Sequence, residues 1–253
     1  MLLVTLVVVE APAAVASTPL RPWRAHVREA EAYAATRAGT VSFGVRTRHG
    51  LRGVGVERTM PSASVVKAML LVAYLRQPGV RGRRLRPDER ALLGPMIRRS
   101  DNAAASQVCN IVGTGGLERL AARVRMHRFH ATRPWGLSSI DVADQTRFFL
   151  HIDRWVPRRH RRYALRLLGS IVPSQRWGIA RVRPRGWALY FKGGWGSGTG
   201  WVDHQVALLR RGRRRLSLAI LITSSPSHAY GNETLRGVAA RLLRNLEPRS
   251  RPR

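Results

Sequence analysis

Apolar and polar positions in the first part of the chain show helical spacing first and strand-like spacing afterwards. Residues 22–36 carry apolar side chains at helical intervals, whereas residues 40–46 and 52–57 show strand patterns around a turn-like spacer. From residue 77 to about residue 183 the pattern is helical, with proline and glycine breaks and no convincing strand pair. This order predicts a helix, a hairpin and a long helical region.

Three strand patterns and a helix end the chain. The strands are predicted at residues 187–193, 202–209 and 216–223, and the helix at about residues 233–246. Strands from both chain ends therefore flank a helical middle. This arrangement predicts an α+β fold, with one antiparallel five-stranded sheet built from both chain ends, flanked by the terminal helices, and an all-helical lobe inserted.

We expect a single domain over residues 17–253, because a chain of 253 residues with 44% apolar content can form one sizeable core. Its α/β lobe is predicted to comprise about residues 22–64 and 185–248, and its helical lobe about residues 65–184. A functional site is expected in the cleft between the two lobes.

Residues 60–74, with the sequence MPSASVVKAMLLVAY, are apolar on every side of a helical period, which predicts a helix buried all round. Lys67 lies within it, and a buried ammonium group is costly unless it is partnered or loses its proton. Ser64, three residues earlier, faces the same side, beside the free backbone N–H groups of the helix N-terminus. The pair indicates an activated nucleophile and its base. A capping serine and a snorkelling lysine would give the same pattern.

Lysine is nearly absent from the rest of the chain. Of the 45 basic side chains, only Lys67 and Lys192 are lysines, and the other 43 are arginines. Arginine keeps its proton in proteins, whereas a buried lysine can lose it, so these two positions indicate a need for a titratable amine. Lys192 lies in an apolar, aromatic strand pattern at residues 187–194, and an S-D-N tripeptide at residues 100–102 lies between the two lysines.

Three short motifs thus follow one another along the chain: S-V-V-K at residues 64–67, S-D-N at residues 100–102 and K-G-G at residues 192–194. They resemble the S-x-x-K, S-D-N and K-T-G motifs of the class A β-lactamases and the related penicillin-binding proteins. The resemblance covers about residues 23–246. It implies the same two-lobed fold that the strand and helix patterns predict.

The resemblance implies a role for each catalytic position. Ser64 would be the nucleophile, and Lys67 would be its base or proton relay. Ser100 would pass a proton to the leaving amine. Lys192 would supply positive potential to Ser100 and to a substrate carboxylate.

The resemblance also implies the substrate-binding positions. Asn102 would hold the substrate amide, while Gly193, Gly194 and Trp195 would line the bound substrate. The backbone N–H groups of Ser64 and Trp195 would form an oxyanion hole. The implied substrate is a small β-lactam or a peptidoglycan-like molecule.

One departure from the family pattern concerns the third motif. The hydroxyl residue of K-T-G is Gly193 here, so one hydrogen bond to a substrate carboxylate is missing. Ser197 or Thr199, in the glycine-rich segment that follows, could replace it, or both could serve only the loop.

The second departure is the absence of the glutamate that activates the deacylating water in class A β-lactamases. Residues 125–135 contain His127, His130 and Arg133 but no carboxylate, and Glu118 lies too early, in a helical pattern. Loss of a general base costs typically about 10²–10⁴ in rate, which predicts a long-lived acyl ester. His127 or His130 could substitute as a base, or both could be ordinary solvated histidines.

The formal net charge of +31 would suit a polyanionic partner. The arginines form many short runs without a nucleic-acid-binding motif, so no specific nucleic-acid partner is expected. Anionic envelope polymers are the natural partner, and arginine-rich codon usage on a solvated surface is the alternative. Cys109 is the only cysteine, which excludes an internal disulfide, and the scattered histidines predict no metal or cofactor site.

Residues 1–9 form an apolar run too short to span a bilayer, and an A-x-A pattern follows at residues 14–16. We therefore expect a signal peptide over residues 1–16, a secreted or envelope-associated protein, and no transmembrane segment. A short buried N-terminal strand is the alternative interpretation of this run.

Three functions are compatible with these observations. The first is a secreted β-lactamase-like serine hydrolase that forms a Ser64 acyl-enzyme with a β-lactam or a related amide or ester. The second is a penicillin-binding or D,D-peptidase-like protein with slow deacylation, which the missing glutamate favours. The third is a catalytically silent, basic envelope-binding protein, against which the two lysines at the catalytic positions argue.

Overall fold

The computed structural model describes residues 23–197 and 201–246. The predicted signal peptide and Thr199 lie outside these residues. No helix within the described residues is both long enough and apolar enough to cross a membrane.

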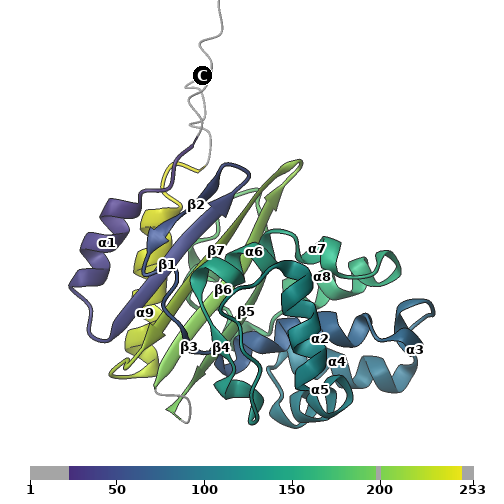
Figure 1. The fold of residues 1–253 in the computed structure, drawn as a ribbon. Helices are drawn as coiled ribbons and strands as arrows, with labels where there is room; N and C mark the ends of the chain where they lie inside the picture. The colour runs from purple at the N-terminus through teal and green to yellow at the C-terminus, as the bar shows by residue number, and fades with distance from the viewer. Residues whose placement is uncertain (1–22, 198–200, 247–253) are drawn as a thin grey trace, which may run out of the picture.

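Five antiparallel strands form the main sheet in the order β2-β1-β7-β6-β5. They are β1 (Thr40–Thr47), β2 (Gly50–Val54), β5 (Ala188–Gly196), β6 (Val202–Arg211) and β7 (Arg214–Thr223). Strands from the two ends of the chain meet where β1 pairs with β7 (Figure 1). The predicted α+β fold with a five-stranded antiparallel sheet is confirmed.

The hairpins of this sheet are tighter than the sequence pattern predicts. The β1–β2 pairing continues to Thr47 opposite Gly50, and the β6–β7 pairing continues to Arg211 opposite Arg214. Gly50 and Gly212 adopt positive φ angles, which short turns between strands require. Arginines that look like loop residues in the sequence therefore lie at the ends of long strands.

Helices cover both faces of the sheet. α1 (Val27–Ala35) and α9 (His228–Leu242) pack against each other on one face, and α6 (Val142–Leu150) lies across the other (Figure 1). α9 begins earlier than predicted, because the Ser227 hydroxyl accepts a hydrogen bond from the Tyr230 amide and caps the helix. α6 belongs to the stretch predicted as a helical lobe, but it packs against β1 and β7.

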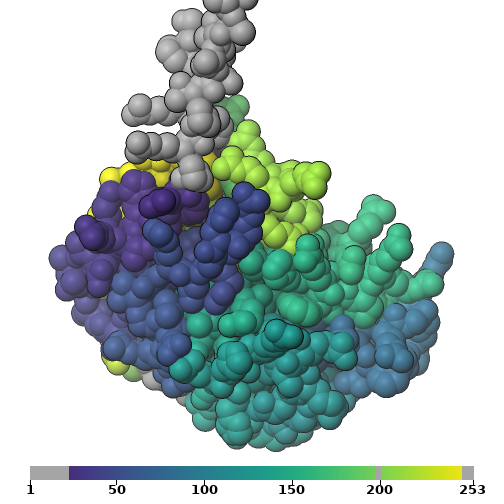
Figure 2. Space-filling view, turned by 45° about the horizontal axis from the view of Figure 1, so that its top comes forward, coloured from purple at the N-terminus to yellow at the C-terminus, as the bar shows by residue number. Residues whose placement is uncertain are grey.

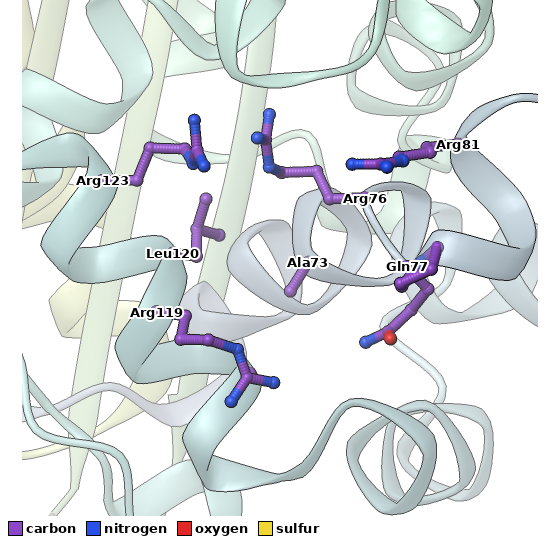
Figure 3. A pocket seen from close by; sticks show the side chains of 9 residues that line it. Ala73, Arg76, Gln77, Arg81, Arg119, Leu120 and Arg123 are labelled. Carbon is purple, nitrogen blue, oxygen red and sulfur yellow. The ribbon is translucent and has the colours of Figure 1, made fainter.

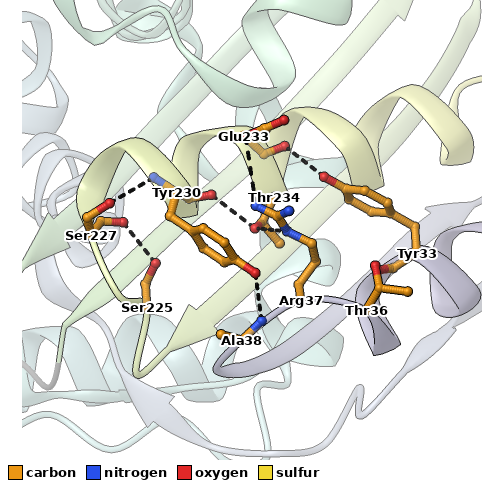
Figure 4. Close-up of polar contacts among 9 residues, drawn as sticks. All are labelled: Tyr33, Thr36, Arg37, Ala38, Ser225, Ser227, Tyr230, Glu233 and Thr234. Atoms are coloured by element: carbon orange, nitrogen blue, oxygen red, sulfur yellow. Dashed lines mark hydrogen bonds and ion pairs between the residues drawn. The ribbon is translucent and has the colours of Figure 1, made fainter.

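A network around Arg37, just after α1, joins the two terminal helices (Figure 4). The Arg37 guanidinium lies 3.8 Å from the centroid of the Tyr230 ring, and its Nε donates to the Thr234 hydroxyl at 2.9 Å. The Tyr230 hydroxyl accepts a hydrogen bond from the Ala38 amide at 2.9 Å. These contacts hold α1 against α9 on one face of the sheet.

The middle of the chain forms a cluster of helices beside the sheet. They are α2 (Lys67–Leu75), α3 (Pro78–Arg81), α4 (Pro87–Arg98), α5 (Asn102–Val124), α7 (Ile152–Trp155) and α8 (Arg161–Gly169). The space-filling view shows this teal middle on one side and the purple and yellow chain ends on the other (Figure 2). α2 is buried along its whole length, in agreement with its apolar sequence. α5 is kinked at Gly113, which has φ 68° and ψ 163°.

A two-residue ladder marks the passage from the sheet into the helical cluster. β3 (Met60–Pro61) pairs with β4 (Ser139–Ile140), and the Ser62 amide then donates to the Ser138 carbonyl at 2.8 Å. The sequence pattern does not predict this pairing, because two residues are too short to show a period. Short 3-10 turns complete the connections between the described elements: η1 (Ala63–Val66), η2 (Trp135–Leu137), η3 (Arg158–His160), η4 (Pro173–Gln175) and η5 (Gly178–Val182).

Candidate active site

Ser64 lies in η1, the 3-10 turn that leads directly into α2 at Lys67. The α-helix therefore begins three residues after Ser64, which differs from the continuous helix expected over residues 60–74. Ala63 has a φ of 41°, and a non-glycine residue in the left-handed region costs about 1–3 kcal/mol. Ser64 is nearly buried, and its hydroxyl has no hydrogen-bond partner among the described residues.

The Lys67 side chain is fully buried and points to the S-D-N turn. Its Nζ donates to the Ser100 carbonyl oxygen at 2.5 Å, to Asn102 Oδ1 at 2.7 Å and to the Ser100 hydroxyl at 3.2 Å. The Trp135 ring covers the same amine, with its centroid 4.7 Å from Nζ. The amine thus has neutral oxygen partners and an aromatic neighbour rather than a carboxylate.

Ser100 lies between the two lysines of the chain. Lys192 Nζ donates to the Ser100 hydroxyl at 3.0 Å and to the Gly193 carbonyl oxygen at 2.7 Å. Ser100 has a φ of 59°, and Asp101 caps α5 by accepting a hydrogen bond from the Ala104 amide at 2.8 Å. The capped turn holds the Ser100 hydroxyl where both amines reach it.

Burial changes the protonation of both amines. It lowers the pKa of Lys67 to about 7, and the nearby Asp101 charge only partly offsets this effect. Burial also holds the pKa of Lys192 well below its usual range, and the Lys67 charge lowers it further. Two ammonium groups on one buried hydroxyl repel each other, so the pair does not carry two full charges near neutral pH. The Lys67 amine is therefore able to accept a proton at pH 7.

Strand β5 approaches η1 so closely that only glycine fits at position 194. A Cβ atom there would lie 2.8 Å from the Ser64 nitrogen, 2.9 Å from the Val65 nitrogen and 3.0 Å from the Ser62 oxygen. Trp195 follows directly on the same strand. The two backbone N–H groups expected to form the oxyanion hole, those of Ser64 and Trp195, thus belong to adjoining segments.

Position 193 has no room for a side chain either. A Cβ atom on Gly193 would lie 2.9 Å from the ring of Trp177. That ring makes edge contacts with Trp195 and His228, at centroid distances of 5.6 Å and 5.2 Å. His228 Nδ1 lies 2.5 Å from the buried carboxylate of Asp203. The departure from K-T-G therefore has a physical reason, since an aromatic cluster fills the space beside Gly193.

The loop at residues 125–135 ends with an indole ring at the site. Trp135 makes hydrogen bonds to two other segments: its Nε1 donates to the Ser106 hydroxyl at 3.2 Å, and its carbonyl oxygen accepts from the Ser62 hydroxyl at 3.4 Å. The sequence analysis did not single out this residue. A tryptophan after a proline carries no period that would show which way it points.

The titratable side chains in this loop, and that of Glu118 on the neighbouring α5, contact groups other than Lys67 or face solvent. Glu118 accepts a hydrogen bond from the Ala131 amide at 2.6 Å, and His130 Nδ1 lies 3.4 Å from the same carboxylate. The His130 side chain is 73% exposed, and His127 is also exposed. Glu118 therefore anchors the loop. Within the described part of the chain, no group of three or more His, Cys, Asp or Glu residues could hold a metal ion.

His204 is a further residue that the sequence analysis did not single out. It is buried on β6, where its Nδ1 accepts from the Ile222 amide at 3.0 Å and its Nε2 donates to the Pro61 carbonyl oxygen at 2.9 Å. Burial lowers the pKa of His204 to about 4, so the ring is neutral at pH 7. This histidine fixes the segment just before Ser64 to the sheet.

Comparisons with known proteins agree with this geometry. Residues 84–246 match the model of a family described as the β-lactamase enzyme family. The matched segment contains the S-D-N and K-G-G positions and begins after S-V-V-K. No curated protein matches the chain significantly.

Solved structures with similar folds include two β-lactamases and a penicillin-binding protein. The β-lactamase from Sphaerobacter thermophilus DSM 20745 has 19% identity and a TM-score of 0.74, with 85% of this chain and 96% of that chain covered. A point mutant of the class A β-lactamase of the last common ancestor of Gram-negative bacteria has 14% identity and a TM-score of 0.76, covering 89% and 100%. The structure of PBP-A has 16% identity and a TM-score of 0.70, covering 85% and 92%.

At these identities, the structural likeness shows a shared fold. The family match carries more weight, because it extends over more than half of the chain and includes two of the three motifs. The chain belongs to the β-lactamase enzyme family.

Proposed function

We propose that the protein is a serine acyl-transfer enzyme that forms an ester between Ser64 and a β-lactam or a related amide or ester. Membership of the family supports a hydrolase that acts on amides. The observation that carries the serine mechanism is the pair of buried lysines that donate to the single hydroxyl of Ser100. All the other Lys or Arg positions of the chain are arginines. A basic side chain that only supplied charge at a solvated surface would therefore be expected to be an arginine as well.

In the first step, the neutral Lys67 amine takes the proton of the Ser64 hydroxyl as the oxygen attacks the carbonyl carbon of the substrate. A C–O bond forms, and the carbonyl electrons move to the oxygen. The backbone N–H groups of Ser64 and Trp195 would stabilise this oxyanion. Asn102, whose Oδ1 accepts from Lys67, has its amide nitrogen left to bind the substrate.

In the second step, the C–N bond breaks and the leaving nitrogen needs a proton. The Ser100 hydroxyl would donate it and be reprotonated by Lys67, which returns the proton taken from Ser64. Lys192, on the other side of the same hydroxyl, stabilises the negative charge that Ser100 develops. The net result is the transfer of one proton from the Ser64 hydroxyl to the leaving nitrogen. This agrees with a pair of amines that does not carry two full charges, because Lys67 must be neutral to accept that proton.

Hydrolysis of the acyl ester is expected to be slow. The loop that would carry a deacylating glutamate presents Trp135 to Lys67 instead, and Glu118 binds a loop amide. A water molecule at the ester would therefore depend on Lys67 alone for activation. This supports a protein that acylates readily and releases product slowly.

Recognition of a substrate carboxylate is also expected to be weak. Trp177 fills the space beside Gly193, and the buried Asp203 adds negative charge to the neighbouring strand. Ser197, one of the two candidate replacements for the missing hydroxyl, is exposed at the end of β5. Lys192 would be left as the main cationic anchor.

Two alternatives remain open to test. A penicillin-binding or D,D-peptidase-like protein would form the same Ser64 ester, but its natural substrate would be peptidoglycan-like and it would hydrolyse a β-lactam ester slowly. A catalytically silent envelope-binding protein would use the basic surface alone. Secretion, or attachment to anionic envelope polymers, is part of the same proposal and is supported by the leader-like residues 1–16.

Pre-steady-state kinetics with a chromogenic cephalosporin tests the proposal. We expect a burst of product close to one per protein molecule, followed by turnover about 10²-fold slower or more, because a deacylation base is lacking. The Ser64→Ala variant is the control and should show no burst. Rapid linear turnover would indicate an efficient β-lactamase, whereas no reaction with any amide or ester would favour the binding-only alternative.

A further inference from the structure

A pocket outside the candidate active site has a polar lining made mostly of arginines. It has a volume of about 280 Å³ and lies where the end of α2 and the short helix α3 face the second half of α5. Ligand pockets usually measure about 300–1,000 Å³, so this one suits a compact ligand. Its polar lining consists of four arginines and a glutamine: Arg76, Arg81, Arg119, Arg123 and Gln77.

Three of the four arginines reach the same side of the pocket. Figure 3 shows the guanidinium groups of Arg76, Arg81 and Arg123 along one side, with Arg119 and Gln77 on the other. Arg76 donates to the Trp155 carbonyl oxygen at 2.7 Å, which fixes its direction. All five residues offer hydrogen-bond donors.

No acidic residue lines the pocket. Arginines elsewhere in the chain do pair with carboxylates, as in Arg83 with Glu89 at 2.7 Å and Arg215 with Asp153 at 2.8 Å. In contrast, the side chains of Arg81, Arg119 and Arg123 have no hydrogen-bond or ion-pair partner among residues 23–197 and 201–246. Their charges are therefore not compensated by the part of the protein that the structure describes.

The grouping of three of these charges, on Arg76, Arg81 and Arg123, is unfavourable on its own. The Arg119 guanidinium lies apart from them, because it turns back along α5, where a Cβ atom on Gly115 would lie 3.3 Å from Arg119 Nη1. Burial lowers the pKa of Arg76, and the charges of Arg123 and Arg81 lower it further. Positions near helix C-termini favour single cations, but this does not explain why three guanidinium groups meet on one side of a cavity. A bound anion would remove the repulsion.

We infer that this pocket binds a compact phosphate group with two or more negative charges, such as pyrophosphate. Planar guanidinium groups match the oxygens of phosphate in pairs, and the three of Arg76, Arg81 and Arg123 suit a multiply charged anion better than a single carboxylate. Lys67 begins α2 and Arg76 follows its end, about 13 Å away along the helix. The pocket is thus separate from the Ser64 site, and a bound anion would link α2 to α5.

Calorimetric titration of the full chain with pyrophosphate tests this inference. The double variant Arg81→Gln/Arg123→Gln should weaken binding at least about tenfold, because two of the three grouped guanidinium groups are lost. The double variant Arg158→Gln/Arg159→Gln removes the same charge from exposed residues on η3 and should change the affinity less than about threefold. Thermal unfolding of both variants without ligand checks that they remain folded.

Three results would overturn the inference: no binding of pyrophosphate by the wild-type chain, an equal loss in both double variants, or a loss only in the η3 variant. An equal loss would indicate attraction by the net charge alone. A poly(glycerol phosphate) probe, with one charge per phosphate, distinguishes a free compact anion from an envelope polymer. We expect it to bind at least about tenfold more weakly than pyrophosphate, and tighter binding that depends on Arg81 and Arg123 would contradict the compact, multiply charged ligand.

Discussion

Substituting Lys67 by arginine is expected to lower the rate of Ser64 acylation by about 10²–10⁴, the usual loss when a general base is removed. Arginine keeps the positive charge but does not give up its proton at any accessible pH. The Lys67 amine is fully buried among the Ser100 oxygens, Asn102 and Trp135, so its neutral form is the chemically useful one. Stopped-flow measurement of the cephalosporin burst gives the acylation rate.

The pH dependence of the wild-type burst provides the second half of this test. The pKa of Lys67 is lowered to about 7, so the amine is protonated and inactive as a base below that pH. Acylation should therefore rise with pH, reach half of its maximum near pH 7 and level off above about pH 8. A Lys67→Met variant, of similar length and without charge, should be as slow as Lys67→Arg. Retained acylation in folded Lys67→Arg protein would mean that charge alone is needed at this position.

Replacing Gly194 by alanine is expected to lower acylation by about 10²–10³, comparable to removing one donor from an oxyanion hole. The added Cβ would lie within 3.0 Å of three backbone atoms, those of Ser62, Ser64 and Val65. Either η1 or β5 must move, and the N–H groups of Ser64 and Trp195 then lose their relative positions. Single-turnover kinetics under saturating substrate measures this loss.

Gly79→Ala is the matched control for this variant. Gly79 lies in α3, it does not precede a proline, and a Cβ atom there would meet nothing within 4 Å beyond its chain neighbours. Alanine is more favourable than glycine in a helix, so this variant should be at least as stable as the wild type and equally fast. If Gly194→Ala acylated as fast as Gly79→Ala, the close approach of β5 to η1 would have no role in the reaction.

Much of the fold could be predicted from the sequence, because its long elements have clear periods. The alternating and continuous apolar runs of β5, β6 and β7, and the wholly apolar α2, were each recognisable from sequence alone. The two-residue ladder of β3 and β4 and the docking of α6 on the sheet were not. Neither feature leaves a periodic signal, since both depend on contacts between distant parts of the chain.

The residues of the candidate site also fall into those that could be predicted from the sequence and those that could not. Residues with unusual chemistry for their sequence context, above all Lys67 and Lys192, could be identified because lysine is so rare here. The structure brings them to the two sides of Ser100. Trp135 and Trp177 could not be identified, because their importance lies in the space they fill beside Lys67 and Gly193. Volume and direction of a loop side chain are properties of the folded chain only.

Mass spectrometry of the protein after incubation with a labelled penicillin tests the proposed chemistry most directly. We expect a stable mass increment equal to one opened penicillin, located by peptide mapping on the fragment that contains Ser64, and no increment in the Ser64→Ala variant. An unmodified wild-type protein without turnover, or an increment that persists in Ser64→Ala, would show that Ser64 is not the acylated nucleophile.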